Sequence, residues 1–156
     1  MSKAAREAVA DWLMLLGAVI LGSSLFLAWS HQFSRGFAAR YAHHAVLQGA
    51  AQDPTAWQVY SVVDVLLAGL AVGLLAVALR GTPPGRVAVL LGVAVALAFV
   101  IHALGSPPTD GADLYDPSLS PPGYTPDHPT SAAGEVVALV GLGLGAIGVL
   151  VSFTAD

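Results

Sequence analysis

The sequence predicts an all-α membrane protein, a bundle of four transmembrane helices with cytoplasmic termini and two long outer loops. Apolar residues gather in four long runs, 12–29, 57–79, 87–104 and 136–153. Each run approaches the roughly 20 residues that a helix needs, at about 1.5 Å per residue, to cross a bilayer core about 30 Å thick. Hydrophobic residues make up 56% of the 156-residue chain and charged residues only 10%, whereas soluble domains carry about 25% charged residues. We therefore predict that residues 1–156 form a single four-span domain, with outer loops at 30–56 and 105–134.

The first run follows a short charged segment at the N-terminus. Lys3 and Arg6 precede it, as basic residues precede the core of a secretory signal, but Glu7 and Asp11 interrupt this basic region. The run is also longer than the usual signal core of about 7–15 residues. We therefore expect a retained transmembrane helix at 12–29.

The first outer loop contains a helical pattern. Phe33, Phe37 and Tyr41 recur every four residues, which places their side chains on one face of a helix. This spacing predicts a short amphipathic helix that lies on the membrane surface or over the bundle. The alternative is an irregular loop whose three aromatic side chains rest at the interface.

Small residues recur at four-residue spacing within the later spans. Gly69 and Gly73 share one stripe of the second span, and Gly141 and Gly145 share one stripe of the fourth. Such stripes allow the backbones of neighbouring membrane helices to approach closely. We expect the second, third and fourth spans to pack together through these faces.

The second outer loop is rich in proline. Proline at this density interrupts helices and sheet ladders, so we expect an irregular segment. Asp110, Asp113 and Asp116 are spaced three residues apart in this loop, but they lack the alternate-position ligands and the final glutamate of a calcium-binding loop. The pattern predicts no more than a weak attraction of cations.

The distribution of basic residues predicts the orientation of the bundle. Lys3 and Arg6 precede the first span, and Arg80 and Arg86 flank the short connection between the second and third spans. Basic residues close to a span favour the cytoplasmic side. Both termini are then cytoplasmic and the two long loops lie outside, in a multi-pass protein of the plasma membrane. Two arginines in the first outer loop, at positions 35 and 40, oppose this assignment.

The three tryptophans support the limits of the first two spans. Trp12, Trp29 and Trp57 lie at the ends of the apolar runs. Tryptophan favours the headgroup region, where its ring is apolar and its N–H finds a partner. We expect all three side chains to anchor the bundle at the two membrane interfaces.

Asp64 is the most informative polar residue, because it lies about 10 Å inside the second predicted span at 1.5 Å per residue. An ionised carboxylate at this depth costs several kcal/mol unless it is paired, hydrated or protonated. One interpretation is a proton or cation site, in which His102 pairs with Asp64. The other is a structural aspartate that holds helices together through hydrogen bonds. The candidate partners near the outer ends of the spans are Ser23, Ser24, Tyr60, Ser61 and His102.

Several classes of function are excluded or disfavoured. The chain has no cysteine, which excludes disulfides and thiolate chemistry. Its basic residues are too few and too scattered for a nucleic-acid surface. No phosphate-binding loop or nucleophile motif is present. Four histidines fall on the outer side without the spacing of a preformed metal site, namely His31, His43, His44 and His128. We predict no metal, no cofactor and no enzymatic activity.

Two stretches resemble a family of membrane proteins. The segments are SLFLAW at 24–29 and TAWQVYSVVDVLL at 55–67. They resemble uncharacterised small four-span membrane proteins of high-GC Gram-positive bacteria and their relatives, in which a similar end of the first span precedes a Trp-x-x-x-(Ser/Gly)-x-x-Asp entry to the second. The resemblance implies a bacterial membrane protein in which Asp64, Trp29 and Trp57 belong to a recurring arrangement. It implies no activity, and it does not extend to the proline-rich loop.

These observations lead to two expectations about function. The first is a non-enzymatic accessory or scaffold component that contacts the lipid bilayer and binds a protein partner, or further copies of itself, through its outer loops. The alternative is a small proton- or cation-coupled transporter or channel subunit that uses Asp64. The chain is small, few polar residues lie inside the spans and the outer loops are substantial, so we favour the first.

Overall fold

The computed structural model describes residues 2–41, 43–44, 47–110, 118, 121–125 and 128–154. Asp113 and Asp116 of the acidic pattern lie outside these residues. Within them, six helices and two short strands form in the following order: α1 (Lys3–Ser24), β1 (Ser30–His31), α2 (Arg35–Tyr41), α3 (Ala56–Val59), α4 (Val63–Arg80), α5 (Pro83–Gly105), β2 (Thr130–Ser131) and α6 (Ala133–Phe153).

The prediction of a helical chain with membrane-spanning segments is confirmed in its main part. Helices α4, α5 and α6 are each long and apolar enough to cross a bilayer. Helix α1 has 22 residues, but it is not among the three candidates, and its first half carries Lys3, Arg6, Glu7 and Asp11. The structure thus supports three candidate spans, whereas the sequence predicted four.

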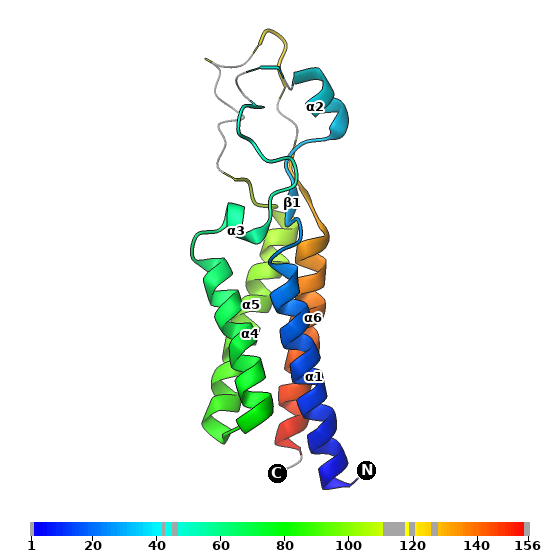
Figure 1. The fold of residues 1–156 in the computed structure, drawn as a ribbon, viewed down its shortest axis with the longest axis vertical. Helices are drawn as coiled ribbons and strands as arrows, with labels where there is room; N and C mark the ends of the chain where they lie inside the picture. Colours follow the sequence, from blue (N-terminus) through cyan, green and yellow to red (C-terminus); the bar gives the residue numbers. More distant parts are fainter. Residues whose placement is uncertain are drawn as a thin grey trace.

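The four long helices run side by side, and successive ones point in opposite directions (Figure 1). Both termini and the turn between α4 and α5 lie at one end of this bundle, which we call the inner end. Helix α2 and the connecting segments extend beyond the other end, the outer end. Helix α1 packs most extensively on α6 and also contacts α4, while α5 contacts α6 and, less extensively, α4.

Local sequence signals set several helix ends. The Ser2 hydroxyl accepts a hydrogen bond from the Ala5 N–H at 3.2 Å and so caps α1. Helix α5 begins at Pro83, directly after the N-cap Thr82, because the ring of proline suits the first helical turn and needs no hydrogen bond there. Ser2 and Pro83 thus mark the starts of α1 and α5, which both lie at the inner end.

Glycines bring α1 and α6 into backbone contact. A Cβ atom added at Gly141 would lie 2.6 Å from the Leu21 nitrogen and 2.9 Å from the Gly17 oxygen, and one added at Gly148 would lie 2.8 Å from the Met14 nitrogen. Gly141 of the expected stripe therefore packs on α1, while a Cβ atom added at Gly145 would lie 2.9 Å from the Leu74 side chain of α4, the second span. Gly69 of α4 meets nothing within 4 Å of such a Cβ, so it is no contact point.

The expected helix over 57–79 is not continuous. Helix α3 ends at Val59, Tyr60 is extended with φ −120° and ψ 137°, and α4 begins only at Val63. The Gln58 side chain accepts a hydrogen bond from the Thr55 N–H at 2.8 Å, which stabilises α3 as a separate single turn. As a result Asp64 lies in the first turn of α4, rather than two turns inside a longer helix.

The two outer loops join into one folded unit. Strands β1 and β2 pair antiparallel, with Ser30 opposite Ser131. On the other side of the same segment, the Trp29 N–H donates to the Pro54 oxygen at 2.9 Å. The Gly134 N–H donates to the Ala28 oxygen at 2.7 Å and ties this sheet to the start of α6. We call the described residues of 28–55 and 106–132 the outer cap.

Helix α2 confirms the helical pattern in the first outer loop. Phe37 packs against Phe33 and Tyr41, with ring centroids 6.0 and 4.8 Å apart, and Tyr124 of the second loop completes the cluster at 5.5 Å from Phe37. Figure 1 shows α2 beyond the outer end of the bundle. Its aromatic face therefore packs within the cap and holds the two outer loops together.

Candidate functional site

Asp64 is almost fully buried at the outer end of the bundle. Its side chain is 3% exposed, and its Oδ1 accepts a hydrogen bond from the Val65 N–H at 2.7 Å. A carboxylate in the first turn of a helix also interacts favourably with the helix dipole. Both contacts are local to α4, and neither joins Asp64 to another helix.

The first interpretation of Asp64 paired it with His102, and the described residues show no such contact. His102 lies in the last turn of α5 with its side chain exposed, and no hydrogen bond or ion pair joins it to Asp64 in the described residues. Ser23 is also exposed. Ser24 is buried, but its hydroxyl donates to the Leu21 oxygen of its own helix at 2.6 Å, as serines in membrane helices commonly do.

Trp29 differs from the two other tryptophans. Trp12 is 65% exposed and Trp57 is 42% exposed, as expected of side chains that face the membrane interfaces. Trp29 is fully buried, and its Nε1–H donates to the Ser24 oxygen at 2.9 Å. Trp29 is therefore a core residue between bundle and cap, because the chain turns back over the end of α1 directly after it.

Tyr60 lies next to Trp29 at the outer end of the bundle. Its ring packs edge-on against Trp29, with centroids 5.6 Å apart, and against Phe99 at 5.2 Å. Burial raises the pKa of Tyr60 to about 12, and the negative charge that Glu135 carries when ionised adds to this shift. The phenol is therefore neutral at ordinary pH, and Tyr60 and Glu135 interact through space.

Glu135 is the buried acidic residue that the sequence did not single out. Its side chain is 0% exposed, and neither carboxylate oxygen accepts a hydrogen bond of ordinary geometry from a described residue, although the Ala132 backbone interacts with it electrostatically. It lies in the first turn of α6, where the helix dipole favours a carboxylate. The preceding residue, Gly134, packs directly on Ala28 and Trp29 of the cap.

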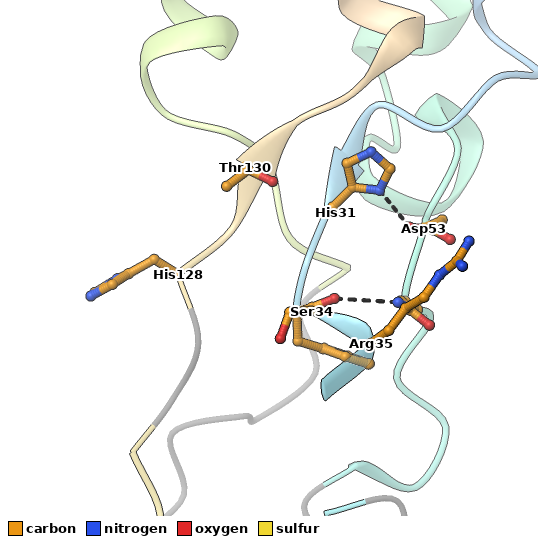
Figure 2. A pocket seen from close by; sticks show the side chains of 8 residues that line it. His31, Ser34, Arg35, Asp53, His128 and Thr130 are labelled. Atoms are coloured by element: carbon orange, nitrogen blue, oxygen red, sulfur yellow. Dashed lines mark hydrogen bonds and ion pairs between the residues drawn. The ribbon is translucent and has the colours of Figure 1, made fainter. Parts of the chain in front are cut away.

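A polar cleft of about 310 Å³ opens in the outer cap between the two loops. His31 of β1 turns its ring toward Asp53, and Nδ1 lies 2.5 Å from the Asp53 carboxylate (Figure 2). This contact orients the imidazole. Arg35 of α2 and Thr130 of β2 also line the cleft. The cleft thus presents an acidic, a basic and a titratable side chain within one opening.

Hydrogen bonds across the cap hold this cleft in place. The Asp110 carboxylate accepts from the Ala51 N–H at 2.9 Å, and the Gln32 amide donates to the Ala51 oxygen at 2.7 Å. Gln32 also accepts from the Asp110 N–H at 3.4 Å. These contacts connect the second outer loop to the first, so the lining residues belong to one folded surface.

The cleft does not gather a set of metal ligands. His128 lines it but points away from His31 and Asp53 (Figure 2). Among the described residues, no group of three histidine, aspartate or glutamate side chains is arranged to hold a metal ion. The lining residues His31, Arg35 and Asp53 offer groups for hydrogen bonding and ion pairing.

An apolar groove of about 620 Å³ runs between α4 and α5. Leu66 and Leu70 of α4 and Leu91 and Val95 of α5 line it, with Gly92 among the lining residues. The groove exists because α4 and α5 pack less extensively than the other neighbours. The groove forms part of the apolar surface along the sides of the bundle.

Comparison of the chain with protein-family models, with curated proteins and with solved structures found no match.

Proposed function

We propose that this chain is a four-span protein of a bacterial plasma membrane, with α1 as the fourth span. Large apolar side chains of α1 point away from the bundle core, among them Val9, Trp12, Leu16 and Val19. The same kind of exposed apolar surface covers α4, α5 and α6. A soluble protein seldom exposes so continuous an apolar surface, so α1 and the three candidate spans favour the same apolar solvent.

The positions of the arginines support cytoplasmic termini. The Arg6 guanidinium donates to the Thr154 oxygen at 3.0 Å, and the Arg86 guanidinium donates to the Ser152 oxygen at 3.3 Å. Both arginines thus lie at the inner end, where the chain begins and ends. Basic residues near spans favour the cytoplasmic side, which leaves the outer cap on the external side.

Within this arrangement, the chain acts as an accessory or scaffold component that binds a protein partner through its outer cap. The observation that carries this proposal is the cap itself. Hydrogen bonds and an aromatic cluster order two outer loops into one surface with a polar cleft. Ordering a loop costs about 1–2 kcal/mol of conformational entropy per residue, and a cap that only connected spans would not require this order.

Quantitative copurification from native membranes tests the proposal. The informative variant is Arg35→Glu, which reverses a charge in the cleft, and its matched control is Arg40→Glu, which makes the same change on α2 outside the cleft. We expect a partner in fixed stoichiometry with the wild type and with Arg40→Glu, and its loss with Arg35→Glu. A partner that both variants retain would refute the cleft as the contact, and a chain that copurifies with no protein at all would refute the accessory function.

A second candidate is a small proton- or cation-coupled transporter or channel subunit. Asp64 and Glu135 are both buried at the outer end, and buried acidic residues in membrane proteins often bind protons or cations. Conduction through a bundle of this size requires several copies, so this candidate also predicts a homo-oligomer. Proton flux into liposomes measures it directly. Flux that Asp64→Asn abolishes while the fold remains intact would replace the accessory function with this one.

A further inference from the structure

The outer end of the bundle buries a carboxyl group that is poorly satisfied. Glu135 is 0% exposed, and neither of its oxygens accepts a hydrogen bond of ordinary geometry from the described residues, although the Ala132 backbone interacts with it electrostatically. Asp64, the other buried carboxylate at this end, accepts a well-formed hydrogen bond from the Val65 N–H.

An ionised Glu135 would be costly in this environment. Removing a carboxylate from water without a partner costs several kcal/mol, and in practice such a group takes up a proton. The surroundings are largely aromatic, because Trp29 packs against the neighbouring Gly134 and Tyr60 packs against Trp29 and Phe99. The conformation in which the cap covers Glu135 therefore accommodates the neutral, protonated form of this side chain.

Glu135 is also coupled to the contact between bundle and cap. A Cβ atom added at the preceding Gly134 would overlap the Trp29 ring and lie 2.7 Å from the Ala28 oxygen, so this turn of α6 packs tightly on the cap. The Gly134 N–H donates to the same Ala28 oxygen. A movement of the first turn of α6 that admits water to Glu135 would therefore also loosen the packing of Gly134 on Trp29.

We propose that Glu135 is a proton-binding site that locks the outer cap onto the bundle. In the locked state the side chain holds a proton, and the cap covers it. When the proton passes to the external solution, the carboxylate requires water, and the first turn of α6 moves away from Trp29 to admit it. The ligand of this site is the proton alone.

The elements around Glu135 carry few other titratable groups at this end of the bundle among the described residues. Asp64 of α4 is the other buried acidic group at this end of the bundle. Tyr60, between α3 and α4, stays neutral until strongly alkaline pH. His102 of α5 is exposed, and α1 carries no titratable residue from Trp12 to its end. Glu135 is therefore the titratable group beneath the cap whose change of charge bears most directly on the contact between cap and bundle.

Infrared spectroscopy of the detergent-solubilised protein tests the charge state. With isotope-labelled glutamate, the wild type should show the carbonyl band of a protonated carboxylic acid at neutral pH, and the band should disappear in reversible fashion at alkaline pH. Glu135→Gln should lack it, whereas Asp64→Asn should retain it. Absence of the band from the folded wild type at neutral and mildly acidic pH would overturn the proposal.

Fluorescence tests the opening of the cap. In a background with Trp12→Phe and Trp57→Phe, the emission reports on Trp29 alone. Quenching by a water-soluble quencher should rise several-fold as the pH increases, and Glu135→Gln should remove this rise, because glutamine keeps the shape and cannot ionise. Quenching that is independent of pH, or equally dependent on pH in the glutamine variant, would refute the lock. Both tests are independent of partner binding and of transport.

Discussion

The contact between α1 and α6 predicts a sharp difference between two neighbouring glycines of α6. In Gly141→Ala the new Cβ atom would lie 2.6 Å from the Leu21 nitrogen and 2.9 Å from the Gly17 oxygen. These are backbone atoms, so no side chain can rotate away. To restore even the 3.0 Å below which real Cβ contacts are essentially absent, the helices must separate by about 0.4 Å. Overpacking of this kind costs about 1–3 kcal/mol.

Gly143→Ala is the matched control, because it makes the same substitution two residues along the same helix. A Cβ atom at Gly143 meets nothing within 4 Å. Alanine also favours a helix over glycine by about 0.5–1 kcal/mol, so this variant should be as stable as the wild type or slightly more stable. Gly17→Ala, on the α1 side, should behave like Gly141→Ala, since its Cβ would lie 2.6 Å from the Gly145 nitrogen.

Thermal unfolding in detergent micelles measures the difference. We expect a clear decrease in melting temperature for Gly141→Ala and Gly17→Ala, and no decrease for Gly143→Ala. Helical content before the transition should be the same in all variants, because the helices persist and only their separation changes. Equal melting temperatures for Gly141→Ala and Gly143→Ala would refute the close backbone approach of α1 and α6.

Three further predictions concern the outer end of the bundle. Trp29→Phe removes one of two hydrogen bonds to the Ser24 oxygen, which also accepts from the Leu27 N–H, and this loss should lower the free energy of unfolding by about 0.5–1.5 kcal/mol. Burial raises the pKa of Tyr60 from 10.0 to about 12. A tyrosine absorbance titration should therefore show one phenol that ionises at higher pH than the others. The stability that the neutral phenol contributes should be lost as the pH rises through about 12. Asp64→Asn keeps an oxygen acceptor for the Val65 N–H but removes the charge at the start of α4, and should cost only about 0.3–1 kcal/mol in thermal unfolding.

Each of these predictions has its own control. Trp12→Phe alters an exposed tryptophan and should leave the free energy of unfolding within about 0.5 kcal/mol of the wild type. Tyr60→Phe should remove the late step from the absorbance titration, and its persistence would assign the shifted pKa to another tyrosine. Asp64→Ala removes the acceptor as well as the charge, so a loss no greater than that of Asp64→Asn would contradict the hydrogen bond to Val65.

Local signals in the sequence predicted much of the secondary structure. The spacing of Phe33, Phe37 and Tyr41 predicted α2, because residues four apart share a helical face. The apolar runs predicted α4, α5 and α6 within a few residues at most ends. The break between α3 and α4 was not predicted, because residues 57–62 are apolar enough to extend a helix. In the structure the extended backbone of Tyr60 ends α3 at Val59.

The arrangement of polar residues at the outer end was far less predictable. The sequence left open a pair between Asp64 and His102, but the break after α3 moves Asp64 to a helix start, and the His102 side chain is exposed. Trp29 was expected at the interface, because tryptophan favours that position in most membrane helices. The hydropathy pattern of a span does not indicate where the chain turns after the last residue of that span. This turn determines which side chains the cap covers.

The sequence by itself determined that long helices form and that their surroundings are apolar, because helix length and hydropathy are properties of single segments. Only the tertiary structure decided that Glu135 is shut away from water as well as Asp64. The hydrogen bond between Gly134 and Ala28 joins the start of α6 to the segment that follows α1. Burial of Glu135 is a property of two distant segments in contact, and neither segment reveals it alone.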